Sequence, residues 1–153
     1  RYDESPKDSR VTASAMTIEY RINHSVSADQ FIGLLENTSL GVRRPLDDRT
    51  CIEGMIRNAN LIISAWDSSR LVGIARSVTD FHYACYLSDL AVDEAYQTSG
   101  IGKRLQVLTQ QQLGPHCSII LLAAPLAKDY YGRIGYTHNE RCWVLSPGES
   151  LAD

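Results

Sequence analysis

The sequence contains no long apolar run and no long run of basic residues. No apolar stretch approaches the roughly 20 residues needed to cross a bilayer, and the N-terminal residues contain no apolar signal-peptide core. The formal net charge is -3, and no long basic run is present, which argues against binding driven by nucleic-acid phosphates. We therefore expect a soluble, cytoplasmic protein with no membrane or nucleic-acid partner.

The cysteines are few and far apart. Their four positions are Cys51, Cys85, Cys117 and Cys142. This spacing matches neither a Cys-x-x-Cys pair nor a familiar zinc site, so no metal is expected. We interpret them as reduced thiols in the core or at the surface. The alternative is a nucleophilic cysteine paired with a histidine, for which no local motif is present.

The length and composition favour one domain. The chain has 153 residues, and its 44% hydrophobic content is enough to fill a single core. Residues 1–15 are polar and show no periodicity, and Met16 follows them directly. We predict a disordered leader or a non-native remnant over 1–15 and a single domain over 16–153.

Hydrophobic periodicity predicts a mixed α/β fold. The segments with strand character are 17–22, 61–66, 71–78, 83–92, 118–124 and 136–145. Those with helical spacing are the stretch after Ser27, 47–58, 100–114 and 128–134. The three strands over 61–92 are separated by short turns and indicate an antiparallel meander. Residues 118–124 form an uninterrupted apolar run, which predicts a strand buried on both faces.

The most informative stretch joins the strand at 83–92 to the helix that begins near Gly100. It reads Asp89-Leu90-Ala91-Val92-Asp93-Glu94-Ala95-Tyr96-Gln97-Thr98-Ser99-Gly100-Ile101-Gly102-Lys103-Arg104. Small residues at Ser99, Gly100 and Gly102 leave backbone N–H groups uncovered. A phosphate can approach these donors at the positive end of the helix, and Lys103 adds a full charge.

Two common phosphate motifs do not fit this stretch. A P-loop requires glycine where Gln97 stands and serine or threonine where Arg104 stands. A dinucleotide fingerprint requires glycine where Leu105 stands, and it follows alternating βαβ units that this sequence lacks. A nucleotide-binding protein is therefore a weak alternative.

The run Gln97-Thr98-Ser99-Gly100-Ile101-Gly102 resembles the acetyl-coenzyme A loop of the GNAT N-acetyltransferase superfamily, Gln/Arg-x-x-Gly-x-Gly/Ala. Leu90-Ala91-Val92 resembles the end of that family's fourth strand. Tyr130-Tyr131-Gly132-Arg133-Ile134-Gly135-Tyr136 resembles its downstream aromatic element. One departure is Ala124, where many relatives carry an asparagine that contacts pantetheine. The resemblance covers roughly residues 61–145.

The resemblance implies a single GNAT-type domain with a mostly antiparallel, splayed sheet flanked by about four helices. It implies an enzyme that transfers acetyl from acetyl-coenzyme A to a primary amine in a ternary complex, without a metal. Family habit alone makes a homodimer a possible assembly. The implied cofactor-binding residues are Leu90, Ala91, Val92, Gln97, Thr98, Ser99, Gly100, Ile101, Gly102, Lys103 and Tyr131.

Acetyl transfer requires two proton movements. By resemblance, Tyr131 donates a proton to the coenzyme A thiolate. The attacking amine, with a pKa of about 10.4, must first lose a proton, which costs roughly 4 to 5 kcal/mol at neutral pH. Asp89 is the candidate base, with Glu94 and ordered water as rivals, and Ser88 can position water if Asp89 points away.

Two questions stay open at this stage. The acceptor can be a small molecule or a protein amine, among them polyamines, amino sugars, antibiotics, aryl-alkyl amines and amino acids. The main alternative function is a non-catalytic acyl-coenzyme A-binding or sensing module, which keeps the loop without turnover.

Overall fold

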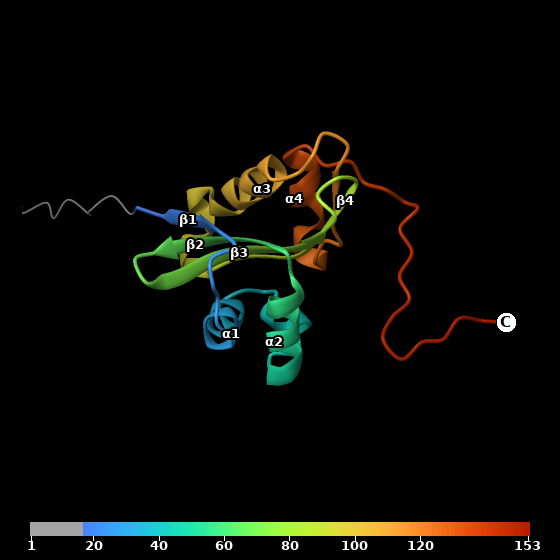
Figure 1. Ribbon diagram of the computed structural model, residues 1–153, viewed down its shortest axis with the longest axis horizontal. Helices are drawn as coiled ribbons and strands as arrows, with labels where there is room; N and C mark the ends of the chain where they lie inside the picture. Colours follow the sequence, from blue (N-terminus) through green and yellow to red (C-terminus); the bar gives the residue numbers. More distant parts are fainter. Residues whose placement is uncertain (1–16) are drawn as a thin grey trace, which may run out of the picture.

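The computed structural model describes residues 17–153, and its centre is one five-stranded sheet (Figure 1). The strands are β1 (Glu19–Ile22), β2 (Leu61–Asp67), β3 (Arg70–Thr79), β4 (Ala84–Val92) and β5 (Ser118–Ile120), in that spatial order. Neighbours from β1 to β4 are antiparallel, whereas β4 and β5 are parallel. The predicted mixed α/β class and antiparallel meander are confirmed. The leader expected over 1–15 lies outside the described residues.

Four α-helices accompany the sheet within the described chain. They are α1 (Ala28–Glu36), α2 (Arg49–Asn58), α3 (Ile101–Gln111) and α4 (Lys128–Arg133). Local caps explain where the first two begin. The Ser27 hydroxyl accepts from the Gln30 N–H while the Gln30 side chain accepts from the Ser27 N–H, and Asp48 accepts from the Cys51 N–H.

The helices cover opposite faces of the sheet, and each face has its own apolar cluster (Figure 1). Successive strand residues point to opposite faces. Ile62 therefore belongs to the cluster beneath α1 and α2, and Ile63 to the cluster beneath α3. At Gly73, an added Cβ would lie 3.0 Å from Ile101 Cγ2 and 3.2 Å from Leu105 Cδ1. Glycine at this position lets α3 lie directly against β3.

Two predicted strands differ from the structure. The segment over 118–124 forms strand only at Ser118–Ile120, and Ser118 and Ile120 are exposed rather than buried on both faces. The reason is that β5 lies at the edge of the sheet, with β4 as its only strand neighbour among the described residues. The segment over 136–145 contains no strand, because it pairs with no other described segment. An apolar pattern alone does not provide a partner.

None of the helices in residues 17–153 combines the length and apolar character that a bilayer span requires.

Candidate functional site

The strands β4 and β5 separate partway along β4. Their pairing is Ala84↔Ser118, Cys85↔Ile119 and Tyr86↔Ile120, so residues 87–92 have no described partner on the β5 side. The Asp93 N–H donates to the Val72 carbonyl of β3 at 2.9 Å. Because antiparallel ladders alternate, the main-chain groups of Leu90 and Val92 face away from β3, whereas those of Ala91 face β3. This geometry leaves the Leu90 amide on the open side of β4.

The Gln97 side chain and a left-handed glycine shape the turn that follows β4. Gln97 Nε2 donates to the Val92 carbonyl at 3.2 Å. Gly100 has φ of 78°, a conformation that strains any residue with a Cβ, and it forms the N-terminal boundary of α3. Buried Ile101 then packs the first turn of α3 into the core.

The first turn of α3 offers free amide donors. The Arg104 N–H closes the first bond of the helix, to the Gly100 carbonyl at 3.1 Å. The N–H groups before Arg104 have no acceptor within the helix, as at the start of any α-helix. No side chain caps them here. The Lys103 side chain is exposed in the same turn. Aligned peptide dipoles and the Lys103 charge together give this end of α3 a positive character that favours an anion.

Gly102 is not required by the packing of the protein. An added Cβ would meet Val92 Cγ2 at 3.6 Å and the Tyr130 hydroxyl at 3.8 Å, which are ordinary van der Waals contacts. Alanine also favours helices more than glycine does. Close approach of a ligand to the main chain would explain glycine at this position, which fits a bound diphosphate.

Two tyrosines of α4 lie near the start of α3, in different surroundings. The Tyr130 hydroxyl accepts a hydrogen bond from Gln106 Nε2 at 3.4 Å. Tyr131 packs edge-to-face against Tyr130, with ring centroids 5.2 Å apart, and against Tyr136, at 5.4 Å. Burial, followed by the neighbouring Tyr130, raises the pKa of Tyr131. Its hydroxyl therefore keeps its proton at neutral pH.

Asp89 is fully buried between two arginines on the face of β4 that also carries Ala91. Its carboxylate accepts from Arg44 Nε and from Arg76 Nε, each at 2.5 Å. The same guanidinium groups bind Ser88, Arg44 at the carbonyl at 2.8 Å and Arg76 at the hydroxyl at 2.9 Å. A proton-accepting role for Asp89 would require an ion pair to break.

The sequence interpretation missed Arg44 and Arg76. Arg44 lies 45 residues before Asp89, in the connection between α1 and α2, and no local motif links the two positions. Arg76 directly follows the apolar run Leu71–Ala75 of β3, and this charged residue at a core position was the available signal. Buried charges are normally paired, so its partner was to be expected on a neighbouring strand.

A β-bulge at Ser88 changes the direction of β4 between the paired and open portions. Arg76 pairs with Asp89 and Ser77 with Leu87, which leaves Ser88 as the extra residue. The rival base Glu94 is exposed beyond the end of β4, where its N–H donates to the Asn37 carbonyl at 3.1 Å. The candidate residues are therefore spread over the bulge, the open edge and the turn.

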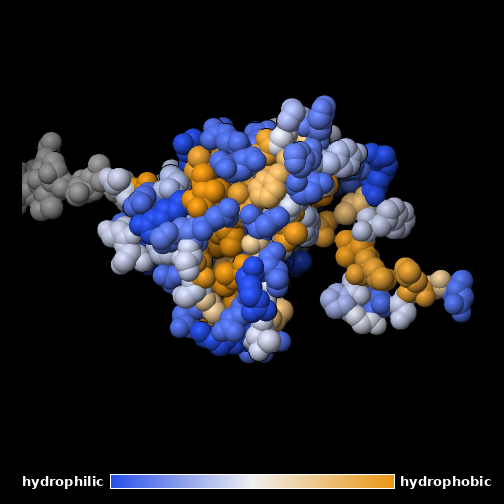
Figure 2. Space-filling model, in the orientation of Figure 1, coloured by the Kyte–Doolittle hydropathy of each residue, from blue (hydrophilic) through white to orange (hydrophobic). Residues whose placement is uncertain are grey.

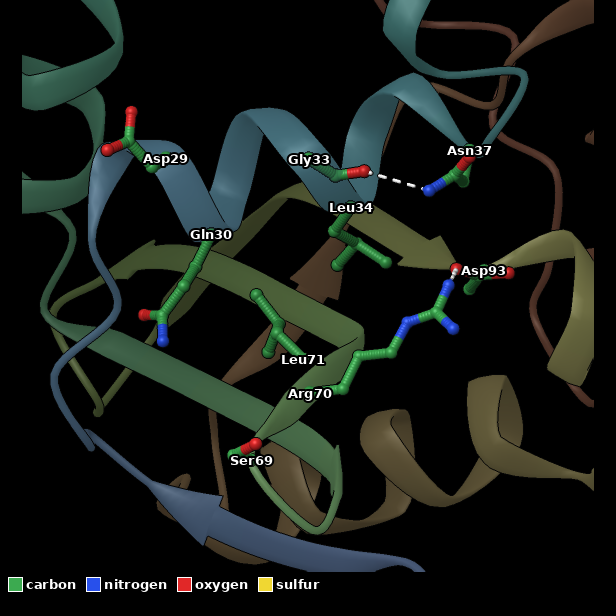
Figure 3. Close-up of a pocket in the computed structure, with 9 residues that line it drawn as sticks. All are labelled: Asp29, Gln30, Gly33, Leu34, Asn37, Ser69, Arg70, Leu71 and Asp93. Atoms are coloured by element: carbon green, nitrogen blue, oxygen red, sulfur yellow. Dashed lines mark hydrogen bonds and ion pairs between the residues drawn. The ribbon is translucent and has the colours of Figure 1, made fainter.

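A separate hollow of about 280 Å³ lies between α1 and the turn from β2 to β3 (Figure 3). Its lining residues are Asp29, Gln30, Gly33, Leu34, Asn37, Ser69, Arg70, Leu71 and Asp93. Arg70 donates to the Asp93 carboxylate at 2.8 Å along its wall. None of the predicted coenzyme residues lines this hollow, so it is distinct from the open edge of β4. Within residues 17–153, no cluster of three or more potential metal ligands is present.

Comparison with known proteins supplies the family. A family model described as an acetyltransferase (GNAT) domain matches residues 41–142. A curated protein described as an uncharacterized N-acetyltransferase ycf52, from Gracilaria tenuistipitata var. liui, is 28% identical over 98 residues. That alignment covers 62% of this chain and 54% of the relative, so the chain spans about half the length of the curated relative.

Solved structures share the fold. A GNAT-family acetyltransferase from Streptococcus pneumoniae TIGR4 matches with a TM-score of 0.68 and 20% identity, over 84% of this chain and 98% of that chain. An aminoglycoside N-acetyltransferase AAC(6')-Iy, solved in complex with CoA, matches with a TM-score of 0.66 and 15% identity, over 86% and 95%. Because the family model matches two thirds of the sequence, this chain belongs to the GNAT acetyltransferase family.

Proposed function

We propose that this protein is an N-acetyltransferase that moves the acetyl group of acetyl-coenzyme A directly to a primary amine. The observation that carries the proposal is the continuity between the open edge of β4 at Leu90 and the uncapped start of α3 at Gly102. An extended acyl arm and its diphosphate require these two features side by side. Membership of the GNAT family supports this assignment.

The chain supplies separate groups for the two ends of the coenzyme. Amides of Ile101, Gly102 and Lys103 bind the diphosphate, with Gln97, Thr98, Ser99 and Gly100 forming the preceding turn. The main chain of Leu90 and Val92 holds the pantetheine arm like an added strand. The Ala91 main chain faces β3 instead, so its role is to hold β4 in the sheet beside the coenzyme.

The reaction needs a stabilised oxyanion and two proton transfers. The Leu90 N–H is the donor that we assign to the thioester oxygen as negative charge develops there. When the amine nitrogen bonds to the acetyl carbon, the carbon–sulfur bond breaks and the thiolate leaves. The Tyr131 hydroxyl donates its proton to that sulfur and is reprotonated from solvent.

We assign the deprotonation of the amine to ordered water rather than to Asp89. Both Asp89 carboxylate oxygens already accept hydrogen bonds from Arg44 and Arg76. The Ser88 hydroxyl lies at the bulge, and Glu94 stands exposed beyond it. In this assignment Asp89 is a positioning residue that anchors the connection after α1 to β4 through Arg44.

The alternative function is an acyl-coenzyme A-binding module without turnover. Calorimetry with acetyl-coenzyme A tests binding, and release of free thiol in the presence of an amine panel tests transfer. An enzyme binds the thioester and releases thiol above background hydrolysis with at least one amine, whereas a sensor only binds. Thermal shift with ATP and NAD serves as the control, because only a true ligand raises the unfolding temperature. The absence of coenzyme A binding would contradict both functions.

The amine panel should span the open acceptor classes. One structural neighbour is named for aminoglycosides, which places amino sugars in the panel beside polyamines, aryl-alkyl amines, amino acids and peptide amines. Ranking by kcat/KM identifies the acceptor, because this ratio reports differential stabilisation of the transition state.

A further inference from the structure

The turn that leads from β4 to α3 has little apolar packing of its own. It is the 3₁₀ turn Glu94–Ser99, which contains no buried residue, and each of its residues except Tyr96 is exposed. A surface turn of this kind opens easily unless specific contacts hold it. The amides assigned to the diphosphate follow this turn directly, so its order bears on coenzyme binding.

Tyr96 links the turn to the end of the β2–β3 hairpin. Its hydroxyl donates to the carboxylate of Asp67, the last residue of β2, at 2.6 Å. A hydrogen bond to a charged acceptor is stronger than one between neutral groups. This bond to Asp67 raises the pKa of Tyr96, so the phenol remains a donor at neutral pH. The Tyr96 ring also packs at the border of the apolar cluster beneath α3.

Arg70 makes a second link from the same hairpin. It pairs with Asp67 across the short turn between β2 and β3. Its guanidinium donates to the Asp93 carboxylate at 2.8 Å (Figure 3), and the guanidinium carbon lies 5.8 Å from the Tyr96 ring centroid. The Asp93 side chain is 4% exposed, and its other oxygen accepts from the Ala95 N–H at 2.9 Å. Both links therefore act on the first half of the turn.

The hairpin is a fixed base for these links. Its strands pair from Leu61↔Ser77 to Asp67↔Arg70, and their buried residues belong to both apolar clusters. The β2–β3 turn lies at the left of the sheet in Figure 1, and Figure 2 shows mainly hydrophilic residues at that end of the domain. Polar contacts at this junction agree with that surface.

We infer that Tyr96, through its bond to Asp67, is a positioning residue that orders the coenzyme A turn before the coenzyme binds. Gln97 follows Tyr96 directly, and the Ser99 hydroxyl donates to the Tyr96 carbonyl at 2.5 Å, so movement of Tyr96 displaces the rest of the turn. When a ligand binds only the ordered conformation, its apparent dissociation constant rises as the ordered fraction falls. The inference rests on the proposed function, because its ligand is coenzyme A.

Tyr96→Phe removes the donor and keeps the ring. We expect it to raise the dissociation constant of coenzyme A in calorimetry, and the KM for acetyl-coenzyme A, by about tenfold each. The kcat at saturating acetyl-coenzyme A should not change, because the bound coenzyme restores the turn. In the ligand-free protein, amide hydrogen exchange over 94–99 should become faster than in the parent protein.

Variants of Asp67 test the same bond from the hairpin. Asp67→Ala removes the acceptor and should reproduce both effects, whereas Asp67→Asn keeps an acceptor oxygen and should retain most of the affinity. Because Tyr96→Phe and Asp67→Ala remove one bond, the double variant should bind no more weakly than either single variant. Tyr83→Phe is the control, since Tyr83 is 75% exposed on the connection between β3 and β4.

Three outcomes would overturn the inference in a parent protein that binds coenzyme A. The first is unchanged affinity in both Tyr96→Phe and Asp67→Ala. The second is weaker binding with unchanged ligand-free exchange over 94–99, because Tyr96 then contacts the coenzyme instead of ordering the turn. The third is a lower kcat with an unchanged KM, which would place Tyr96 in the chemical step. A parent protein that does not bind coenzyme A would contradict the proposed function and this inference with it.

Discussion

Arg76 and Asp89 form a buried ion pair between neighbouring strands, with Arg76 Nε 2.5 Å from the Asp89 carboxylate. The Arg76 side chain is 7% exposed and the Asp89 side chain 0%. Arg44 reaches the other carboxylate oxygen from the connection between α1 and α2. One carboxylate therefore holds together β3, β4 and a connection that lies on the α1 side of the sheet.

Asp89→Asn is expected to destabilise the fold strongly. It removes the charge that compensates two guanidinium groups, and leaving buried charge unpaired costs about 3 to 5 kcal/mol. Urea unfolding monitored by circular dichroism measures this loss. Arg49→Ala is the matched control, because Arg49 pairs with Asp29 and Glu53 at the surface, where a pair contributes about 1 kcal/mol or less. Equal losses in the two variants would contradict a structural role for Asp89.

Gly102→Ala is expected to weaken coenzyme A binding without weakening the fold. The added methyl group fits the protein at ordinary contact distances but covers amides at the start of α3. We expect the dissociation constant for coenzyme A to rise about tenfold, which corresponds to about 1.4 kcal/mol. Calorimetry measures the affinity, and thermal unfolding of the ligand-free protein measures stability.

Gly54→Ala is the control for this experiment. Gly54 lies within α2, and an added Cβ there would meet nothing within 4 Å. Both variants gain helix propensity, but only Gly102→Ala should lose affinity for the coenzyme. If Gly102→Ala binds as tightly as Gly54→Ala does, the start of α3 is not the diphosphate site.

Local signals in the sequence predicted the elements that form the centre of the fold. Ser27 and Asp48 precede their helices as capping residues, and the three strand-like segments over 61–92, separated by short turns, form three consecutive antiparallel strands. Gly100 adopts the left-handed conformation that its place before α3 favours. Each of these features depends on residues close together in the chain, which is why periodicity and capping chemistry reveal them.

Long-range pairing was not predictable in the same way. The ion pairs of Asp89 join residues 13 and 45 positions apart, and no sequence pattern encodes those contacts. The apolar character of 118–124 and 136–145 predicted strands, but strand formation depends on a neighbouring edge. Only Ser118–Ile120 has such a neighbour in the described chain, namely β4.

Tyr131→Phe is expected to lower kcat by about a hundredfold or more, with little change in the affinity for coenzyme A, because general acid catalysis typically contributes about 10²–10⁴-fold. Steady-state thiol release measures kcat, and calorimetry measures the affinity. Tyr130→Phe is the comparison, since it removes the hydroxyl that accepts from Gln106 but leaves the ring beside Tyr131. We expect Tyr130→Phe to retain most of the turnover. Unchanged turnover of Tyr131→Phe across the pH range would remove Tyr131 from the mechanism.

The half-buried Tyr136 side chain is expected to make the fold sensitive to alkaline pH. Burial, followed by Tyr131 and Tyr130, raises the pKa of Tyr136 from 10.0 to about 12. The folded state therefore keeps a proton that the unfolded chain releases, so this stabilising contribution is complete below pH 10 and is lost as pH rises toward 12. Unfolding midpoints in urea at pH 9, 10 and 11 should fall more steeply for the parent protein than for Tyr136→Phe. Tyr83→Phe is the control, because Tyr83 is 75% exposed, and it should follow the parent curve. Identical slopes for the parent protein and Tyr136→Phe would show that the Tyr136 hydroxyl does not control alkaline unfolding.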